Sequence, residues 1–227
     1  MPSCEPILLR GTGVSRRFER ADAGVAAVKD ASFEIGADSR IALVGPSGSG
    51  KSTLLHLMAG LLNPSAGNIS WPALDEAGDG RVGAIAVVFQ APSLVPWLDP
   101  LENVMVPLLL QGLDETAARR EAEAALAAIG LAEIGDKLPE ELSGGEAQRV
   151  AVARAMAQRA RLMLADEPTG QLDQATAREV MSALIHAANR NRAALVVATH
   201  DPAVAAALLV IWRMRHGCLQ VAEQAVV

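Results

Sequence analysis

Residues 40–53 read Arg-Ile-Ala-Leu-Val-Gly-Pro-Ser-Gly-Ser-Gly-Lys-Ser-Thr, a short apolar run that passes into a glycine-rich turn. A helical pattern follows from Lys51 to Leu61, so the order is strand, loop and helix. The turn fits the pattern G-x-x-x-x-G-K-[ST] from Gly45 to Ser52. Its glycines let backbone N–H groups approach phosphate oxygens, and the helix adds its positive N-terminal end. The stretch therefore predicts a phosphate-binding loop at the end of a buried strand.

The residues of this loop have separate expected tasks. Lys51 is expected to reach the β- and γ-phosphates of a nucleotide, and the Ser52 hydroxyl to complete the coordination shell of Mg²⁺. The alternative is a glycine-rich turn that matches the pattern by chance, and the flanking strand and helix argue against it. The expected nucleotide-binding residues are Gly45, Pro46, Ser47, Gly48, Ser49, Gly50, Lys51, Ser52 and Thr53.

Three further short apolar runs predict buried parallel strands, and a polar residue follows each of them. In open α/β sheets, ligands bind beyond the carboxyl ends of the strands, so these polar residues are expected to share one site with the phosphate loop. The runs are 84–89, 162–165 and 195–199, and the polar residues are Gln90, Asp166 and His200.

Two acids close the run at 161–167, Arg-Leu-Met-Leu-Ala-Asp-Glu. We expect Asp166 to hold Mg²⁺, directly or through water, and Glu167 to polarise the attacking water as general base. The alternative is a solvent-exposed acid pair at a strand end, and it is weak beside an intact phosphate loop.

Strand signals are absent between Gln90 and Arg161, and the pattern there is helical. Residues 114–129 place alanine, leucine and isoleucine on one helical face, with Asp114 as N-cap and Gly130 as the stop. A second helix is expected to begin at Ser143. We interpret the segment as a helical lobe inserted into the nucleotide-binding core.

Residues 142–146 read Leu-Ser-Gly-Gly-Glu and look like a helix start. Ser143 is a natural N-cap and Glu146 lies three residues on, as in a capping box. Two glycines at a helix start destabilise the helix unless another group must approach the backbone closely. A γ-phosphate held by free N–H groups is one such group.

The string from Leu142 to Ala155 resembles the signature sequence of ATP-binding-cassette (ABC) ATPases, with Ala147 where the family often has glutamine. The resemblance covers nearly the whole chain. It implies an α/β fold: a P-loop NTPase core with a mostly parallel sheet, an N-terminal antiparallel β portion and an inserted α-helical subdomain. The expected division is a nucleotide-binding core at 1–90 and 159–227 and a helical subdomain at 91–158.

The resemblance also implies roles for residues outside the phosphate loop. Gln90 matches the glutamine that contacts Mg²⁺ or the water and senses the γ-phosphate, and His200 matches the histidine that contacts the γ-phosphate and orients the water. Asp173 matches an aspartate that crosses between subunits. Phe18 lies where the family stacks an aromatic side chain on adenine, and a core phenylalanine is the alternative. The signature residues that would face the partner's nucleotide are Ser143, Gly144, Gly145 and Glu146.

The resemblance implies a head-to-tail homodimer that closes when it binds ATP and opens after hydrolysis. The strings 88–97, 102–104 and 166–173 resemble the bacterial branch that serves lipoprotein-release and macrolide-export systems. A membrane permease would then dock on the apolar patch Leu94–Leu98, which would place the chain in the cytoplasm, peripheral to the inner face of the membrane. Ordinary packing of the helical lobe is the alternative for that patch. A tryptophan at the position of Trp97 also occurs in some importers, so an import role remains an alternative. A regulatory, cell-division-like cassette and a permease-free ABC ATPase are further alternatives.

Bulk properties limit the classes of function. A chain of 227 residues with net charge −6 carries no electrostatic footprint for nucleic acid, so no nucleic-acid partner is expected. Charged residues and prolines interrupt the two most apolar stretches, 94–110 and 193–212, so neither is expected to span a membrane. Cys4 and Cys218 lie at opposite ends of the chain and are expected to be lone reduced thiols, with a disulfide between them as the alternative.

Overall fold

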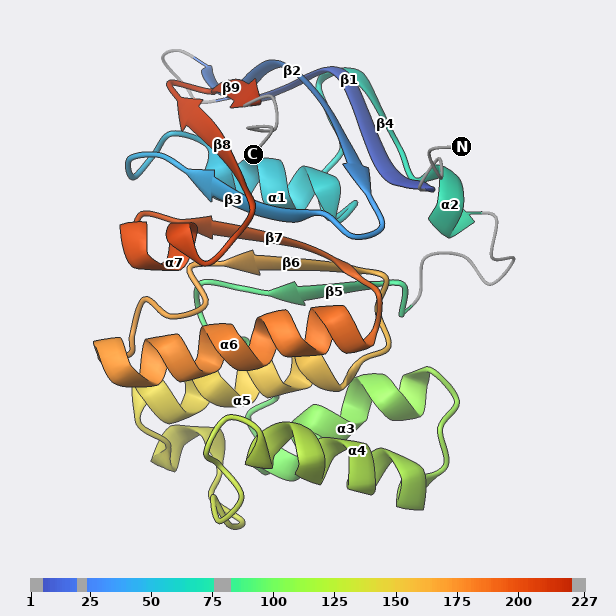
Figure 1. Cartoon of the computed structure of the whole chain (residues 1–227), viewed down its shortest axis with the longest axis vertical. Coiled ribbons are helices and arrows are strands. Elements are labelled where there is room, and N and C mark those ends of the chain that lie inside the picture. Colours follow the sequence, from blue (N-terminus) through green and yellow to red (C-terminus); the bar gives the residue numbers. More distant parts are fainter. Residues whose placement is uncertain (1–5, 20–23, 76–82, 222–227) are drawn as a thin grey trace.

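A computed structural model describes residues 6–19, 24–75 and 83–221. Its described strands form one nine-stranded sheet in the order β4-β1-β2-β9-β8-β3-β7-β6-β5 (Figure 1). The strands are β1 (Ile7–Phe18), β2 (Val25–Gly36), β3 (Arg40–Val44), β4 (Ala66–Ser70), β5 (Ile85–Val88), β6 (Leu162–Asp166), β7 (Ala194–Thr199), β8 (Val210–Arg215) and β9 (Cys218–Val221).

The sheet has a parallel part and an antiparallel part. The strands β5, β6, β7, β3 and β8 pair in parallel, whereas β1 pairs antiparallel with both β2 and β4. The expected α/β class, with a mostly parallel core and an N-terminal antiparallel portion, is confirmed. Strands β6 and β7 are buried along their full length, because helices α5 (Gly144–Ala157) and α6 (Gln174–Arg190) cover one face of the parallel part, and helix α1 (Lys51–Met58) with the curled antiparallel strands covers the other.

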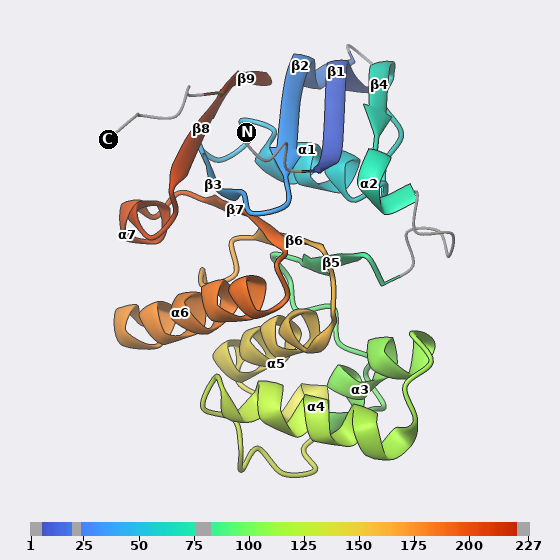
Figure 2. The same cartoon turned by 45° about the vertical axis from the view of Figure 1, so that its right-hand side comes forward.

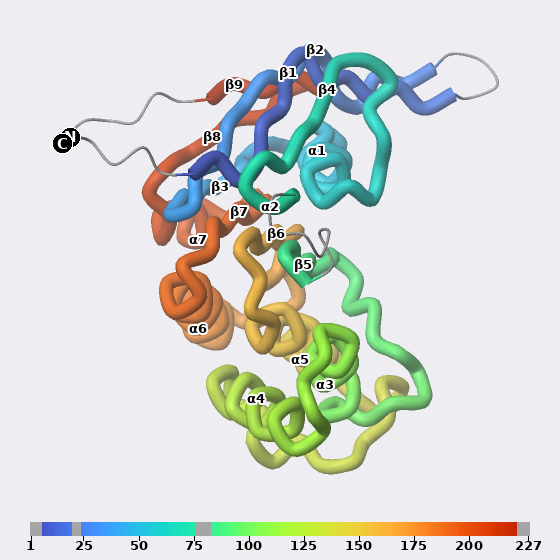
Figure 3. The backbone as a smooth tube through the Cα atoms, turned by 90° about the vertical axis from the view of Figure 1, so that its right-hand side faces the viewer, coloured from blue at the N-terminus to red at the C-terminus, as the bar shows by residue number. Residues whose placement is uncertain are grey.

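The helices are α1 (Lys51–Met58), α2 (Pro72–Asp75), α3 (Pro100–Leu110), α4 (Glu115–Ala127), α5 (Gly144–Ala157), α6 (Gln174–Arg190) and α7 (Pro202–Ala206), with a 3₁₀ turn at Pro139–Glu141. Helix α1 lies on the concave side of the sheet, between β3 and the antiparallel strands (Figure 2). Helices α5 and α6 lie on the opposite face, with α3 and α4 beyond them (Figure 3).

Alternate residues of each central strand belong to different cores, as the two-residue period of a strand requires. On β6, Leu162 and Leu164 join the core around α1, whereas Met163 and Ala165 join the core of α3 to α6. One short strand therefore fixes both helical layers, and its carboxyl end delivers Asp166 between them.

The helix after the phosphate loop is shorter than its sequence pattern predicts. It was expected to run from Lys51 to Leu61, but it ends at Met58. Gly60 adopts a left-handed φ of 71°, and the Leu61 N–H donates back to the His56 carbonyl at 2.9 Å. Glycine is favoured in this conformation, so it stops the helix while the pattern of apolar residues continues.

The helical lobe follows its predicted start and stop signals. Asp114 caps α4 by accepting from the Ala117 N–H at 2.9 Å, and Gly130 lies just beyond the helix with φ 71°. Helix α5 packs on α3 and α4 but also on β5 and α6. Helix α5 therefore contacts both the helical lobe and the nucleotide-binding core, and the division at 91–158 stays a prediction.

Within the described residues, no helix is both long enough and apolar enough to cross a bilayer. The stretch 94–110 forms a loop and α3, and 193–212 forms β7, α7 and part of β8. Cys218 is exposed with a free thiol, and Cys4 lies outside the described residues.

Candidate active site

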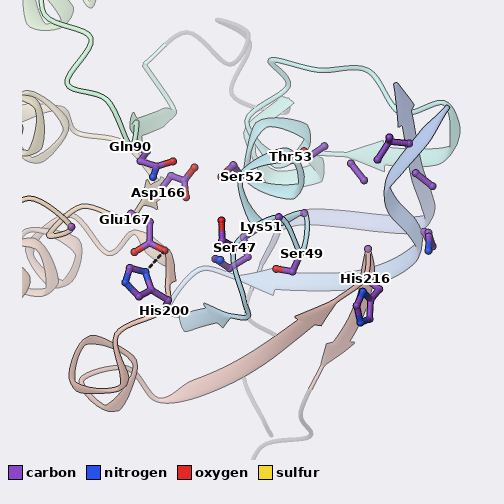
Figure 4. A pocket seen from close by; sticks show the side chains of 18 of the residues that line it. Ser47, Ser49, Lys51, Ser52, Thr53, Gln90, Asp166, Glu167, His200 and His216 are labelled. Atoms are coloured by element: carbon purple, nitrogen blue, oxygen red, sulfur yellow. Dashed lines mark hydrogen bonds and ion pairs between the residues drawn. The ribbon is translucent and has the colours of Figure 1, made fainter. Parts of the chain in front are cut away.

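A cavity of 760 Å³ lies at the carboxyl ends of β3, β6 and β7, beside the N-terminus of α1 (Figure 4). In Figure 4, Gln90, Asp166, Glu167 and His200 lie together on one side of it, and Ser47, Ser49, Lys51, Ser52 and Thr53 lie on the other. The cavity-lining residues that the sequence predicted are Ser47, Gly48, Ser49, Gly50, Lys51, Ser52, Thr53, Gln90, Asp166, Glu167 and His200. Segments far apart in the chain therefore meet at one edge of the sheet, as expected for parallel strands.

The glycine-rich loop is shaped by its neighbours. Gly50 has φ 106°, and a side chain there would collide with the Ala27 carbonyl of β2. Gly45 is equally confined by the Met214 carbonyl of β8, whereas Gly48 has φ 72° and nothing within 4 Å of its missing Cβ. Gly45 and Gly50 thus allow the loop to nest into the sheet, and Gly48 leaves its outer surface open to a ligand.

Helix α1 presents free N–H groups to the cavity. Its N-cap Gly50 offers no side-chain hydrogen bond to the first turn, so these donors stay available for an anion. Lys51, only 7 % exposed, folds its Nζ over the loop and donates to the carbonyls of Gly45 at 2.9 Å and Pro46 at 3.2 Å. Positive charge and backbone donors therefore converge where a phosphate would lie.

Glu167 is held in an uncommon backbone conformation. Its φ of 47° lies in the left-handed region, which costs a non-glycine residue about 1 kcal/mol. The Glu167 N–H donates to the Ala198 carbonyl of β7 at 2.9 Å, and the carboxylate Oε1 lies 2.9 Å from the His200 Nδ1. The side chain of Glu167 is 12 % exposed and that of His200 is 71 % exposed. The strained turn therefore fixes a nearly buried carboxylate at the cavity wall, and the histidine covers it from the solvent side.

Asp166 lies deeper than Glu167 and has an unused oxygen. The residue is 4 % exposed, and its Oδ1 is buried without a hydrogen-bond partner. Burial raises the pKa of the Asp166 carboxyl and the Glu167 carboxylate raises it further, while the Ser52 hydroxyl lowers it. A buried, unpaired carboxylate oxygen beside a serine hydroxyl and the Gln90 amide matches the oxygen ligands that Mg²⁺ prefers.

The signature segment lies outside the cavity lining. Ser143 caps α5 in the expected capping box: its hydroxyl accepts from the Glu146 N–H at 3.2 Å, and Glu146 accepts from the Ser143 N–H at 2.8 Å. That N–H bond and the bond from the Ser143 hydroxyl lower the pKa of the Glu146 carboxyl. Helix start and cap are confirmed, and the roles of Ser143, Gly144, Gly145 and Glu146 toward a nucleotide stay predictions.

The glycine pair also has close neighbours within the chain. A Cβ on Gly144 would lie 2.7 Å from the Gln171 Oε1, and a Cβ on Gly145 would lie 3.3 Å from the Leu172 Cδ2. Both neighbours are the ends of side chains that can move, so the close approach of a phosphate stays a prediction for these positions. The segment 171–172 packs against them directly.

Asp173 acts as the N-cap of α6. Its Oδ1 accepts from the Ala175 N–H at 2.9 Å and from the Thr176 N–H at 3.1 Å. Hydrogen bonds from the hydroxyl and N–H of Thr176 hold the pKa of the Asp173 carboxyl below its ordinary value. Capping alone accounts for an aspartate here, so its contact with another subunit stays a prediction.

Phe18 is not among the residues that line the cavity. It is 37 % exposed at the end of β1, and the guanidinium of Arg16 lies 4.8 Å from its ring centroid. Gly45, Pro46 and Asp173 are also absent from the lining. Stacking of Phe18 on adenine stays a prediction.

The sequence did not single out several other residues that line the cavity. Gly170 and Gln171 follow Glu167 along the chain, and strand β2 and the β8–β9 turn bring to the cavity Val25, Ala26, Ala27, Lys29, His216 and Gly217. The β8–β9 turn reaches it because the Gly217 N–H donates to the Ser49 carbonyl at 3.0 Å and the Lys29 N–H donates to the Gly217 carbonyl at 2.8 Å. These are long-range backbone contacts, and no local pattern around His216 signals them.

The sequence of this chain is similar to those of known proteins. Residues 28–170 match the family model described as ABC transporter. The lipoprotein-releasing system ATP-binding protein LolD of Shewanella oneidensis is 38% identical and covers 97% of this chain and 99% of its own. LolD of Chromohalobacter salexigens is 39% identical, covering 94% of this chain and 93% of its own.

Solved structures agree in fold. A dimeric, post-hydrolysis structure of the ATP-binding cassette MJ0796 with ADP and Pi has a TM-score of 0.87 at 31% identity, over 95% of this chain and 98% of that one. The structure of cbiO1 from Clostridium perfringens, part of the ABC transporter complex cbiONQ, has a TM-score of 0.76 at 25% identity, over 96% of this chain and 88% of that one.

Proposed function

Because this chain belongs to the ABC transporter family as one of its ATPase subunits, we propose that it drives a separate membrane permease that releases lipoproteins from a membrane. The observation that carries the proposal is the similarity to LolD, which extends over 97% of this chain and 99% of the S. oneidensis protein. Similarity over the full length of both chains supports a shared task more strongly than the phosphate loop alone, which recurs in many unrelated ATPases.

We assign the chemistry of ATP hydrolysis to residues at the ends of the parallel strands. Lys51 would neutralise charge on the β- and γ-phosphates, together with the free N–H groups of α1. Glu167 would accept a proton from the attacking water, and its contact with His200 would keep the carboxylate aimed at that water. Gln90 would face the γ-phosphate from the same side of the cavity as Glu167 and His200.

The residues at the site fit a magnesium ion. Ser52, Gln90 and Asp166 would hold it, and the unpartnered Oδ1 of Asp166 is the observation that supports the assignment. Bound Mg²⁺ would screen the negative charge of the phosphates during the reaction. The positive charge of the ion would favour the ionised form of the Asp166 carboxyl, whose pKa is raised by burial.

We propose that two copies close head to tail on ATP. Ser143 to Glu146, at the start of α5, and Asp173, at the start of α6, would then face the phosphate loop of the partner subunit. The dimeric structures of the cassette MJ0796 support this arrangement. Hydrolysis would remove the γ-phosphate that bridges the halves, so the dimer would open. Residues 91–158 would move as the unit that the permease contacts.

We place the permease contact at the segment Leu94–Leu98 and the chain at the inner face of the membrane. Leu94 packs against the helical core, whereas Trp97 is 75 % exposed. An exposed tryptophan beside partly buried leucines has the character of an interface anchor, because burying its ring contributes strongly to binding. Trp97, and not the whole apolar patch, is thus the proposed contact.

Replacing Trp97 with alanine is expected to weaken permease binding about 30-fold or more, the usual effect of removing a central aromatic anchor. The measurement is the amount of permease that copurifies with the chain from native membranes in mild detergent, with ATP and the Glu167→Gln substitution present. Leu209→Ala is the matched control, because Leu209 is also apolar and 84 % exposed but lies beyond α7. Equal loss with both variants would count against a specific contact at Trp97.

The same purification tests the function as a whole. A permease with few spans and a large extracytoplasmic domain would support the proposal, and release of lipoproteins from reconstituted vesicles would complete it. A partner with many spans would favour import instead. Recovery of soluble proteins alone would overturn the transport assignment.

A further inference from the structure

The segment Val95–Asp99 lies outside any helix or strand, yet it carries the most exposed tryptophan of the described chain. One backbone hydrogen bond closes it, from the Leu98 N–H to the Val95 carbonyl at 3.2 Å. The capping box of α3 holds its far end, where the Asp99 N–H donates to Glu102 at 3.0 Å and the Asp99 Oδ1 accepts from the Glu102 N–H at 2.7 Å. The Asp99 carbonyl also accepts from the Asn103 N–H at 2.9 Å. Most of these contacts are at Asp99, so they are few for a loop that must present a large apolar side chain in one orientation.

A single buried side chain adds four contacts to the loop backbone. Asn103, on the first turn of α3, is 0 % exposed. Its Oδ1 accepts from the Val95 N–H at 2.8 Å. Its Nδ2 lies within hydrogen-bonding distance of three carbonyl oxygens, those of Val95 at 3.2 Å, Leu98 at 2.8 Å and Asp99 at 3.0 Å.

The chemistry of these partners fixes how the amide is oriented. Val95 offers a donor, so the oxygen of Asn103 must face it, and three carbonyls need the amide hydrogens. Asparagine carries one acceptor and one NH₂ group at this reach, whereas aspartate has no donors and leucine has neither. The fully satisfied buried amide therefore determines the path of the loop backbone, in the way that buried polar groups specify one conformation.

We propose that Asn103 is a positioning residue for transport: it holds the segment Val95–Asp99 in the shape that presents Trp97 to the permease. The inference rests on the proposed permease contact at Trp97 and names the residue that pre-organises it. A tryptophan held by a fixed backbone loses less conformational freedom on binding than one on a mobile loop. Asn103 touches neither the nucleotide cavity nor the exposed surface, so its effect passes through the loop.

The first test measures loop order without any partner. Chymotrypsin cleaves after tryptophan, and Trp71 and Trp212 are only 9 % and 2 % exposed, so cleavage at Trp97 reports local opening. In the intact chain, Asn103→Leu is expected to be cut there about tenfold faster or more than the parent chain. Val104→Ala is the matched control, because Val104 is the next residue of α3 and is also 0 % exposed but makes none of these hydrogen bonds. If Asn103→Leu is cut no faster than Val104→Ala at equal thermal stability, the inference is overturned.

The second test uses the copurification of the permease from native membranes. Asn103→Leu is expected to retain about a tenth or less of the permease, whereas Val104→Ala retains the parental amount. Should Asn103→Leu not fold, Asn103→Ser is compared with Val104→Ala in the same two measurements, since its hydroxyl is too short to reach all four groups.

The outcomes separate the two proposals. If Trp97→Ala binds the permease as well as the parent chain does, the proposed contact at Trp97 is overturned, whatever effect Asn103 has on the loop. Loss of binding by Trp97→Ala, together with full binding by a loop-released Asn103 variant, would leave the contact in place and overturn the role of Asn103.

Discussion

Replacing Lys51 with alanine is expected to lower ATP turnover by about 10²- to 10³-fold and to weaken ATP binding, because one charged donor to the phosphates is lost from a nearly buried site. Lys51 is 7 % exposed and donates to two carbonyls of its own loop, so it is already aimed across the place where phosphates would lie. Steady-state phosphate release and binding of a fluorescent ATP analogue measure the two effects.

Lys29→Ala is the control for Lys51→Ala. Lys29 lines the same cavity from β2, so its removal takes the same charge from the same space while leaving the phosphate loop intact. We expect this change to cost less than about tenfold in turnover, as for a charge without a fixed hydrogen bond to the substrate. Parental turnover by Lys51→Ala would refute the phosphate-loop assignment. Equal losses of turnover in both variants would show that Lys51 acts only through its charge and not through a specific contact with the phosphates.

Replacing Glu167 with glutamine is expected to keep ATP binding and lower hydrolysis by about 10²- to 10⁴-fold, the range that general-base catalysis contributes. Glutamine retains the size of the side chain and accepts the same left-handed backbone, but it cannot take a proton from water. ATP should then persist between two subunits, so the variant is expected to elute as a dimer with Mg-ATP on a sizing column and as a monomer without it.

The control for Glu167→Gln is Glu123→Gln, which makes the same change on the exposed surface of α4. It is expected to hydrolyse ATP at the parental rate and to show no ATP-stabilised dimer. If the Glu167→Gln chain binds ATP and hydrolyses none of it, yet stays monomeric, the result would contradict the closure of two subunits on ATP but not the assignment of Glu167 as general base. One that still hydrolyses ATP at the parental rate would contradict the base.

The parts of the fold that follow local patterns were predictable from the sequence. The runs that became β3, β5, β6 and β7 are short and mostly apolar. Strands β6 and β7 are buried along their full length, whereas β5, at the edge of the sheet, alternates between buried and partly buried residues. The starts of α4 and α5 followed from Asp114 and Ser143, because capping is decided within a few residues. The predicted end of α1 was wrong, because the left-handed Gly60 stops the helix at Met58 although the helical pattern continues for three more residues.

The site was predictable wherever its residues follow strand ends or a motif. Gln90, Asp166, Glu167 and His200 line the cavity with the phosphate loop because parallel strands end at the same edge. The left-handed φ of Glu167 was not predictable, because it depends on the turn after β6 and the contact with β7. The same holds for the wall around His216, which depends on how β8 and β9 return beside β2. It also holds for Phe18, whose position depends on the pairing of β1 with β2 and on the Arg16 guanidinium over its ring.

The packing of Gly144 and Gly145 on the segment 171–172 also bears on how this chain and its relatives can diverge. A methyl group at 145 would lie 3.3 Å from the Leu172 Cδ2, so the leucine side chain would have to move by a few tenths of an ångström to accept it. A methyl group at 144 would meet the Oε1 of Gln171, the far end of a side chain that can turn away. Substitutions at 144 and 145 are therefore expected to depend on the side chains at 171 and 172, so neutral drift at the start of α5 is coupled to neutral drift in the turn before α6.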